Sequence, residues 1–385
     1  CIRRQGRIVL HRTLGWSHGH TPDSPDPPGG ARTVVTPETP LCIFSASKAI
    51  TAMVIHLLDE QGLLHVDDPV VEYIPEFGQN GKGWITLRHL LTHRAGIPSA
   101  DSAGGLQKLA DWDGILRELC AAKPSSRPGE RVAYHALTGG FVLGEVVRRV
   151  TGKDIRQVLR EEVLQPIGIR RLNYGVAPED VPLVAHNVFT GVPVFPPFTY
   201  VAQMVLGMGF EEAAVLSNER AFLEAIVPSG NIIGTAEELS RFYQLLLNGG
   251  EYGGTRVFEG RTIRRASQRT TFRDLDLSLL LPMRYGLGFM LGGKWISPFG
   301  PNTQAAFGHL GLMNIHCWAD RWRDTAVGLI TTGKPLVADH LPALFGLLTA
   351  IGAVLYLGVL GAHWLLLRNE EDGQRWVIVA LAATF

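Results

Sequence analysis

The sequence has no net charge, few cysteines and no metal-binding motif, and each absence excludes a class of function. The 36 basic and 36 acidic side chains balance, so there is no basic excess of the kind that marks nucleic-acid-binding proteins. Four cysteines are scattered without Cys-x-x-Cys or metal-ligand spacing, which predicts reduced or core thiols instead of a disulfide framework. The thirteen histidines form no His-Glu-x-x-His run, so we expect no zinc site and no other cofactor. The cysteines are Cys1, Cys42, Cys120 and Cys317.

The remaining composition is that of a globular protein, with one apolar exception near the C-terminal end. Of the 385 residues, 46% are hydrophobic and 19% are charged, which fits one large domain or two. Residues 341–367 contain no acidic or basic side chain apart from His363, and a bilayer-spanning helix needs about 20 mainly apolar residues. After a charged hinge at 368–375, a second apolar run at 376–385 reaches the end of the sequence.

Strand patterns near both ends, with helical patterns between them, predict the fold class. Residues 1–14 alternate apolar and polar side chains, which predicts a hairpin strand of an antiparallel sheet. The segment 179–209 is rich in proline and valine and predicts an irregular loop with short strands. We therefore predict an α+β fold, in which an antiparallel β-sheet flanked by helices is formed from both chain ends and a mostly helical subdomain is inserted. Helices are predicted at 45–61, 85–93, 111–122, 139–150, 155–164 and 235–247, and further strands at 285–291, 307–312, 314–320 and 325–331.

Ser45 and Lys48 form a Ser-x-x-Lys pair at the start of an apolar-periodic segment that stops at Gly62. On a helix, residues three apart share a face, so the Lys48 amine can reach the Ser45 hydroxyl. A desolvated lysine can take the serine proton and so create a nucleophile, and the N–H groups at a helix start favour a developing oxyanion. A capped helix with an exposed lysine would give the same pair, so other motifs must decide.

Tyr134 is a candidate for the proton shuttle that a serine acylation site also needs. It lies in a loop just before the helix predicted at 139–150. A tyrosine whose pKa is lowered by a nearby lysine could accept the serine proton. A buried tyrosine that packs beneath the following helix is the alternative interpretation.

His309, Gly311 and Leu312 form the third candidate stretch, on the strand predicted at 307–312. Gly311 would let a substrate or another backbone approach closely. The Leu312 N–H could complete an oxyanion hole with that of Ser45, and His309 could orient a substrate. A lone histidine on a strand is commonly structural, so this stretch is not decisive alone.

In this order, the three stretches resemble the motifs of the serine β-lactamase-like superfamily. Its members include class C β-lactamases, penicillin-binding D-Ala-D-Ala carboxypeptidases and related esterases, and they carry Ser-x-x-Lys, then Tyr-x-Asn, then Lys-Thr-Gly or His-x-Gly. The similarity includes the segments 86–98, 141–152 and 234–242. It covers about residues 1–351.

The resemblance implies a role for each matching position. Ser45 would be the acylated nucleophile, Lys48 its base partner, and Tyr134 the general base and acid. The positions implied for substrate and oxyanion contacts are His135, His309, Gly311 and Leu312.

Two departures from the family pattern bear on the substrate. The second motif reads Tyr134-His135-Ala136, without the usual asparagine, and the third has histidine and leucine where a lysine and a hydroxyl usually grip a substrate carboxylate. Each lost charge-assisted hydrogen bond should cost an anionic substrate about 1.5–3 kcal/mol. The implied substrate is a neutral, short-chain ester.

We assign residues 1–351 to the hydrolase domain, with its sheet part at about 1–44 and 235–351 and its helical part at about 45–234. Family members usually end in a helix on the outer face of the sheet, and 338–351 fits that role. The tail at 352–385 begins with a run that is apolar on every side, and such a helix is deeply buried or in lipid. We expect membrane association through 352–385, and otherwise a cytoplasmic protein; a buried or dimer-forming helix is the alternative.

Three functions stay open on these grounds. The first is a serine hydrolase that cleaves carboxylic esters through an acyl-enzyme on Ser45. The second is a β-lactamase or D-Ala-D-Ala carboxypeptidase, which would act on a small-molecule amide. The third is a catalytically inactive, membrane-anchored binding module, against which the intact Ser45, Lys48 and Tyr134 argue.

Overall fold

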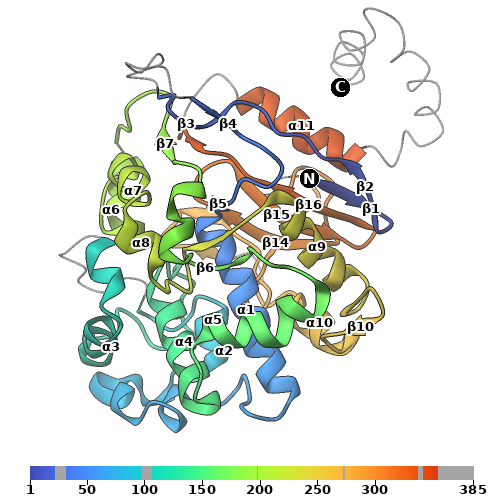
Figure 1. Ribbon diagram of the computed structural model, residues 1–385. Helices are drawn as coiled ribbons and strands as arrows, with labels where there is room; N and C mark the ends of the chain where they lie inside the picture. The colour runs from blue at the N-terminus through green and yellow to red at the C-terminus, as the bar shows by residue number, and fades with distance from the viewer. Residues whose placement is uncertain are drawn as a thin grey trace, which may run out of the picture.

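A six-stranded antiparallel sheet joins the two ends of the chain, as predicted. The computed structural model describes residues 1–21, 32–97, 106–196, 198–271, 274–295, 297–336 and 341–353. The strand order is β13-β14-β15-β16-β1-β2, so the N-terminal hairpin continues the sheet of the C-terminal strands (Figure 1). The strands are β1 (Ile2–Arg4), β2 (Arg7–Leu10), β13 (Met290–Leu291), β14 (Ala306–Gly311), β15 (Ile315–Asp320) and β16 (Thr325–Leu329).

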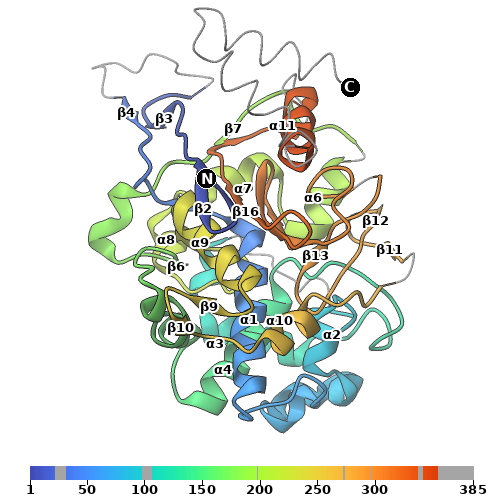
Figure 2. The ribbon, with the colours of Figure 1, turned by 90° about the vertical axis from the view of Figure 1, so that its right-hand side faces the viewer.

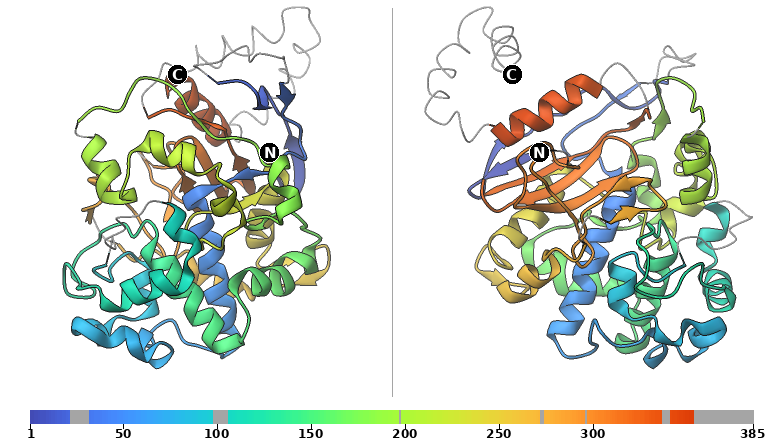
Figure 3. Two further views of the ribbon diagram at one scale, coloured as in Figure 1. Left: turned by 60° about the vertical axis from the view of Figure 1, so that its left-hand side comes forward. Right: turned by 180° about the vertical axis from the view of Figure 1, so that it is seen from behind.

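Helices cover both faces of this sheet. α11 (Leu341–Ala353) lies across the outer face (Figure 3, right), where Leu344, Leu348 and Ile351 pack in one cluster with Trp318 and Val327. This confirms the helix expected there. On the inner face, α9 (Ala236–Leu247) packs on β15 and β16, and α1 (Ser47–Glu60) packs against β14.

The middle of the chain is mostly helical, and α1 runs from the sheet into it (Figures 1 and 2). Twelve of the fourteen α1 residues are buried, so this helix forms the centre of the core. The other helices are α2 (Leu87–Leu91), α3 (Trp112–Ala121), α4 (Thr138–Thr151), α5 (Ile155–Val158), α6 (Phe198–Leu206), α7 (Phe210–Leu216), α8 (Arg220–Glu224) and α10 (Gly260–Ala266). Short turns of helix lie at Phe44–Ala46, Val70–Glu72, Pro75–Trp84, Leu106–Ala110, Leu159–Leu164, Gln165–Ile167 and Pro178–Leu183.

Several small sheets complete the fold. The one that matters for the site has the order β5-β8-β6, because β5 leads directly into Ser45. Its strands are β5 (Leu41–Cys42), β8 (Ile232–Gly234) and β6 (Asn173–Tyr174). The others pair β3 (Trp16–His18) with β4 (Thr33–Val34), β7 (Val188–Phe189) with β17 (Gly333–Lys334), β9 (Glu251–Tyr252) with β10 (Thr255–Arg256), and β11 (Leu275–Asp276) with β12 (Leu281–Pro282).

Side-chain caps explain why the helices are found where the sequence predicts them. Thr86 accepts a hydrogen bond from the His89 N–H, and Thr235 accepts one from the Glu238 N–H, so both start a reciprocal capping box. Such a cap satisfies N–H groups that a helix start leaves without partners.

Three expectations are corrected or lie outside the described residues. The loop predicted at 179–209 contains α6, whose exposed positions include Phe198, Tyr200 and Met204; apolar residues on the solvent side removed the helical periodicity. Of the strand predicted at 285–291, only β13 pairs within the sheet. The tail from residue 354 on lies outside the described residues. No helix in the described ranges is long and apolar enough to cross a bilayer.

Candidate active site

Ser45 lies in a turn before α1, and not on the helix itself as predicted. β5 delivers the chain into a single 3-10 turn, Phe44–Ala46, and α1 begins at Ser47. Phe44 has φ +46° although it is not glycine, a conformation that surrounding packing must hold. The Ser45 side chain is partly exposed, whereas Ser47 is fully buried and accepts a 3.0 Å hydrogen bond from the Ile232 N–H. Ser45 is therefore the accessible hydroxyl of this stretch.

Lys48 connects Ser45 to the loop before β8. Its Nζ lies 3.1 Å from Ser45 Oγ and donates to the Ser229 carbonyl at 3.0 Å. Burial lowers the pKa of the Lys48 amine well below its ordinary 10.5, because a low-dielectric surrounding penalises the ammonium. A neutral amine beside a serine hydroxyl can accept its proton.

Tyr134 reaches the same hydroxyl from the other side. The Ser45 side chain acts on its phenol, where it lowers the pKa, and the Tyr134 ring centroid lies 4.8 Å from Lys48 Nζ. Burial raises the pKa of Tyr134 above its ordinary 10, and the Asp276 charge adds to this while the bond to Ser45 opposes it. The predicted lowering was wrong, because desolvation outweighs the lysine, whose own charge is suppressed. Burial therefore favours the protonated phenol of Tyr134 and the neutral amine of Lys48.

His309 lies on β14 and faces Tyr134, with 6.1 Å between the ring centroids. Its Nδ1 lies 2.6 Å from the Leu310 carbonyl, so Nδ1 carries the proton and Nε2 is an acceptor. Burial, followed by the Lys48 charge, lowers the His309 pKa to about 3. Among the described residues this buried Nε2 has no hydrogen-bond partner, which leaves an acceptor for a substrate or water.

Gly311 ends β14 where the strand meets the turn that carries Ser45. A Cβ atom built on Gly311 would lie only 2.3 Å from the Ile43 carbonyl oxygen, so glycine is needed for the close approach of two backbones, one of the two roles expected for it. Leu312 follows directly and is partly buried. The three stretches predicted from the sequence are thus brought together around Ser45.

Both ring nitrogens of His135 have backbone hydrogen-bond partners. Its Nε2 accepts from the Ile97 N–H at 3.2 Å, and its Nδ1 lies 2.7 Å from the Ala133 carbonyl. Because the backbone occupies both ring nitrogens, neither is free to hydrogen-bond a substrate, and substrate contact by His135 stays a prediction. Burial lowers its pKa to about 4, so the ring is neutral.

Two residues at the centre were missed by the sequence analysis. The His93 ring lies 4.7 Å from that of Tyr134, and the Asp276 carboxylate accepts a 3.1 Å hydrogen bond from the Tyr134 N–H. His93 falls in a segment that carries the family resemblance, so that segment could have indicated it. Asp276 lies in no motif, and the sequence holds no signal for it.

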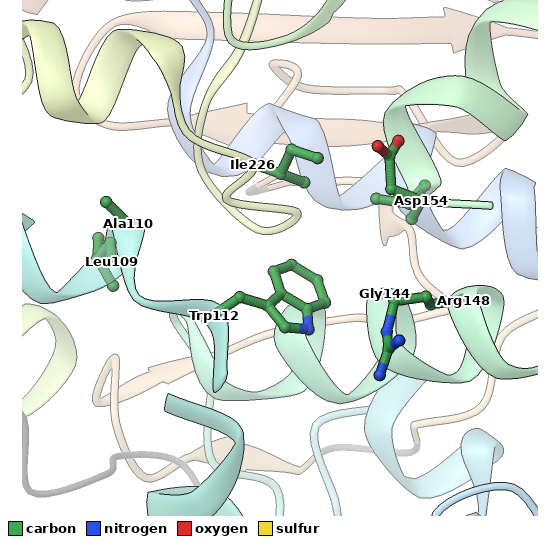
Figure 4. A pocket seen from close by; sticks show the side chains of 8 residues that line it. Leu109, Ala110, Trp112, Gly144, Arg148, Asp154 and Ile226 are labelled. Carbon is green, nitrogen blue, oxygen red and sulfur yellow. The ribbon is translucent and has the colours of Figure 1, made fainter. Parts of the chain in front are cut away.

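Two cavities differ in their relation to Ser45. One of about 30 Å³ lies beside Lys48, and its lining includes His93, His135 and Ser229. A larger one, of about 250 Å³, lies among helices α3 to α5 (Figure 4) and involves none of the residues predicted for the site. It is lined by Leu109, Ala110, Trp112, Gly144, Arg148, Asp154, Ile155 and Ile226.

Comparison with known proteins agrees with this geometry. The beta-lactamase family model matches residues 1–349. The chain belongs to the beta-lactamase family. It is 34% identical to "Esterase/beta-lactamase LipL" of Mycobacterium tuberculosis over 77% of this chain and 71% of the relative. It is 29% identical to "Esterase EstB" of Burkholderia gladioli over 62% of each chain.

Solved structures of the family have the same fold. A family VIII carboxylesterase superposes with a TM-score of 0.70 at 29% identity, over 80% of this chain and 82% of that one. A penicillin-binding protein homologue from Caulobacter crescentus gives a TM-score of 0.70 at 27% identity, over 81% and 83%. The chain is thus a serine hydrolase of the beta-lactamase family with the α+β fold expected from its sequence.

Proposed function

We propose that the protein hydrolyses neutral carboxylic esters through an acyl-enzyme on Ser45. The observation that carries the proposal is the contact between Ser45 Oγ and the Lys48 amine at 3.1 Å, in surroundings that lower the lysine pKa. A hydroxyl paired with a neutral buried amine is an activated nucleophile. The names of LipL and EstB, both esterases, support this substrate class.

Acylation would begin with transfer of the Ser45 proton to Lys48 Nζ as Oγ forms a bond to the ester carbonyl carbon. The negative charge that develops on the carbonyl oxygen would be met by the N–H groups of Ser45 and Leu312. The bond to the alcohol oxygen would then break as Tyr134 gives that oxygen its phenolic proton, which Lys48 replaces. Water would attack the acyl-enzyme by the same proton route in reverse.

Neutral esters are favoured because the third motif, residues 309–311, offers no cation to a substrate. His309 is held neutral by burial, and Leu310 replaces a residue whose hydroxyl would hold a carboxylate. β-Lactams and cell-wall peptides carry a carboxylate that family members bind at this position. Loss of such charge-assisted bonds costs about 1.5–3 kcal/mol each.

A substrate panel tests the proposal. Purified protein would be given p-nitrophenyl esters of graded chain length beside nitrocefin, and labelled with a fluorophosphonate and with a fluorescent penicillin. We expect short esters to be hydrolysed with a far higher kcat/KM than nitrocefin, with fluorophosphonate labelling. Equal kcat/KM values, or penicillin labelling alone, would favour the alternative of a β-lactamase or D-Ala-D-Ala carboxypeptidase. Labelling by neither probe would indicate an inactive binding module.

We also propose that residues 352–385 associate the enzyme with a membrane. α11 exposes Phe345 and Leu347 on its solvent side, and the sequence continues without acidic or basic side chains, apart from His363, as far as Leu367. Carbonate-washed membranes from cells that express the full chain, or a chain ended after Ile351, would be compared. A full chain that stays in the soluble fraction as a single species would contradict the proposal.

A further inference from the structure

Asp276 is a fully buried carboxylate that contacts the backbone of Tyr134. Its Oδ1 accepts hydrogen bonds from the N–H groups of Tyr134 (3.1 Å), Ser278 (3.0 Å) and Leu279 (3.0 Å), and its Oδ2 from the Tyr285 hydroxyl (2.8 Å). A carboxyl group that only accepts is acting as a carboxylate. In the described part of the chain, no lysine or arginine pairs with it. Among the described residues this buried charge has no counter-ion, which is costly and calls for an explanation.

The backbone on either side of Tyr134 is held by a second residue, His93. The Ala133 N–H donates to the His93 carbonyl at 3.0 Å, and the His135 N–H donates to His93 Nδ1 at 3.1 Å. Three consecutive N–H groups thus each find an acceptor on a segment far away in sequence. The position of Tyr134 is therefore fixed by its backbone, independently of its contact with Ser45.

Among the described groups around Tyr134, Asp276 is the one whose charge adds to burial in raising the Tyr134 pKa. Lys48, His93 and His309 also face the phenol, and burial lowers the pKa of each, that of His309 to about 3. Tyr285 faces it too, and burial followed by the Asp276 charge raises the Tyr285 pKa. Burial thus disfavours the charged form of each of these four groups, whereas the Asp276 side chain only accepts hydrogen bonds.

We propose that Asp276 is a positioning residue of the catalytic centre, which holds Tyr134 beside Ser45 and acts on the phenol as a fixed negative charge. The inference rests on the proposed function, because it explains how Tyr134 would serve as the proton donor. A negative charge beside a phenol disfavours the phenolate. Asp276 would therefore keep the proton on Tyr134 until the departing alcohol takes it, and leave Lys48 as the base.

Asp276→Asn separates this role from simple packing. The amide has the shape of the carboxylate and can still accept from the Tyr134 N–H, but it carries no charge. We expect kcat for a p-nitrophenyl ester to fall on the order of tenfold or more, with KM within about twofold of wild type. Because the negative charge is gone, Tyr134 loses its proton more easily, so the alkaline limb of the pH–rate profile moves to lower pH.

Asp320→Asn is the matched control. Asp320, the last residue of β15, is also buried and accepts from the backbone N–H groups of Trp322 and Arg323. Unlike Asp276, it also pairs with the Arg323 guanidinium, at 2.6 Å. This variant should lose some stability while its alkaline limb stays at the wild-type position. A limb that moves equally in both variants would mean that the shift reports general destabilisation and would overturn the proposal.

A titration without turnover tests the same claim even if the proposed function fails. The tyrosinate absorbance of Asp276→Asn, minus that of the same protein with Tyr134→Phe, isolates the titration of Tyr134. We expect it at lower pH than the corresponding wild-type difference. If Asp276→Asn does not fold, Tyr285→Phe is the replacement variant. It removes the hydroxyl that donates to Asp276 Oδ2 and keeps the carboxylate. Tyr134 should then titrate at the wild-type pH or higher.

Failure of the proposed function and failure of the Asp276 inference would give different results. A wild-type protein without Ser45-dependent ester hydrolysis would refute the proposed function, and the absorbance titration would still report on Asp276. An active enzyme whose Asp276→Asn variant keeps the wild-type kcat, alkaline limb and Tyr134 titration would overturn the inference alone.

Discussion

Lys334 provides a stability prediction whose magnitude follows from the structure. This lysine is 0% exposed, its Nζ donates to the Thr331 carbonyl, and the amine lies 5.0 Å from the centroid of the Phe44 ring, next to the nucleophile. Burial lowers its pKa from 10.5 to about 7, partly offset by Cys42. Folding at or below neutral pH must therefore bury an ammonium or remove its proton.

The cost is about 5 kcal/mol, since the pKa falls by about 3.5 units and each unit is worth about 1.4 kcal/mol. Lys334→Met removes this cost. It also leaves the Thr331 carbonyl without its hydrogen-bond donor, which costs about 1–3 kcal/mol of stability. We therefore expect the variant to be more stable than wild type by about 2–4 kcal/mol below neutral pH.

The change of wild-type stability with pH has a direction that tests this explanation. The unfolded chain holds the Lys334 proton up to about pH 10.5 and the folded chain only up to about pH 7, so wild-type stability rises with pH between these values. The advantage of the variant should shrink over this interval and reverse at its upper end. Urea unfolding at about pH 6, 8 and 10 measures the difference.

Lys82→Met is the contrasting control. Lys82 is also 0% exposed, but its Nζ donates to three carbonyls, of Gln79, Cys120 and Ala122. Three stranded carbonyls should destabilise that variant by about 3 kcal/mol or more. A Lys334→Met protein that is less stable than wild type at about pH 6, or whose stability difference does not change with pH, would refute the reasoning.

Other predictions concern the catalytic centre. Lys48→Arg should lower kcat by about 10²–10⁴-fold, because an arginine cannot give up its proton to become a base; retention of activity would contradict the role of Lys48. Since burial lowers the Lys48 pKa, wild-type kcat/KM should rise with pH through a value well below 10.5, and a rise only near 10.5 would contradict the neutral amine. Gly311→Ala would bring Cβ to 2.3 Å from the Ile43 oxygen, so activity and thermal midpoint should both fall. Gly346→Ala, inside α11 with nothing within 4 Å, should keep wild-type activity and should not lower the thermal midpoint.

Local signals in the sequence predicted most of the fold. The Thr86 cap located α2, and an amphipathic pattern after Gly234 located α9. Short strand patterns divided by glycines and a charged turn located β14 to β16. α6 was missed because its apolar residues face solvent. Of the strand predicted at 285–291, only β13 forms, because the glycines at 286 and 288 interrupt the extended backbone. These differences arise where tertiary context overrides a local pattern.

The sequence motifs predicted which residues meet at the site, but they did not predict the pKa shifts of those residues. Ser45, Lys48, Tyr134 and His309 are close together, as the family resemblance implied. The direction of the Tyr134 pKa depends on burial, which no motif encodes. Asp276 is separated from Tyr134 by 142 positions, and nothing in the sequence connects the two.

The central claim is that Ser45 is the acylated nucleophile. Its most direct test is mass spectrometry of peptides from wild-type protein trapped with a fluorophosphonate or a slowly hydrolysed ester. We predict one adduct, on Ser45, and none in Ser45→Ala, whose circular dichroism should match wild type while ester hydrolysis is lost. Ser229 and Ser47 should stay unmodified, since the Ser229 hydroxyl donates to the Leu137 carbonyl and Ser47 Oγ accepts the Ile232 N–H. An adduct on either, or full activity in Ser45→Ala, would contradict the claim.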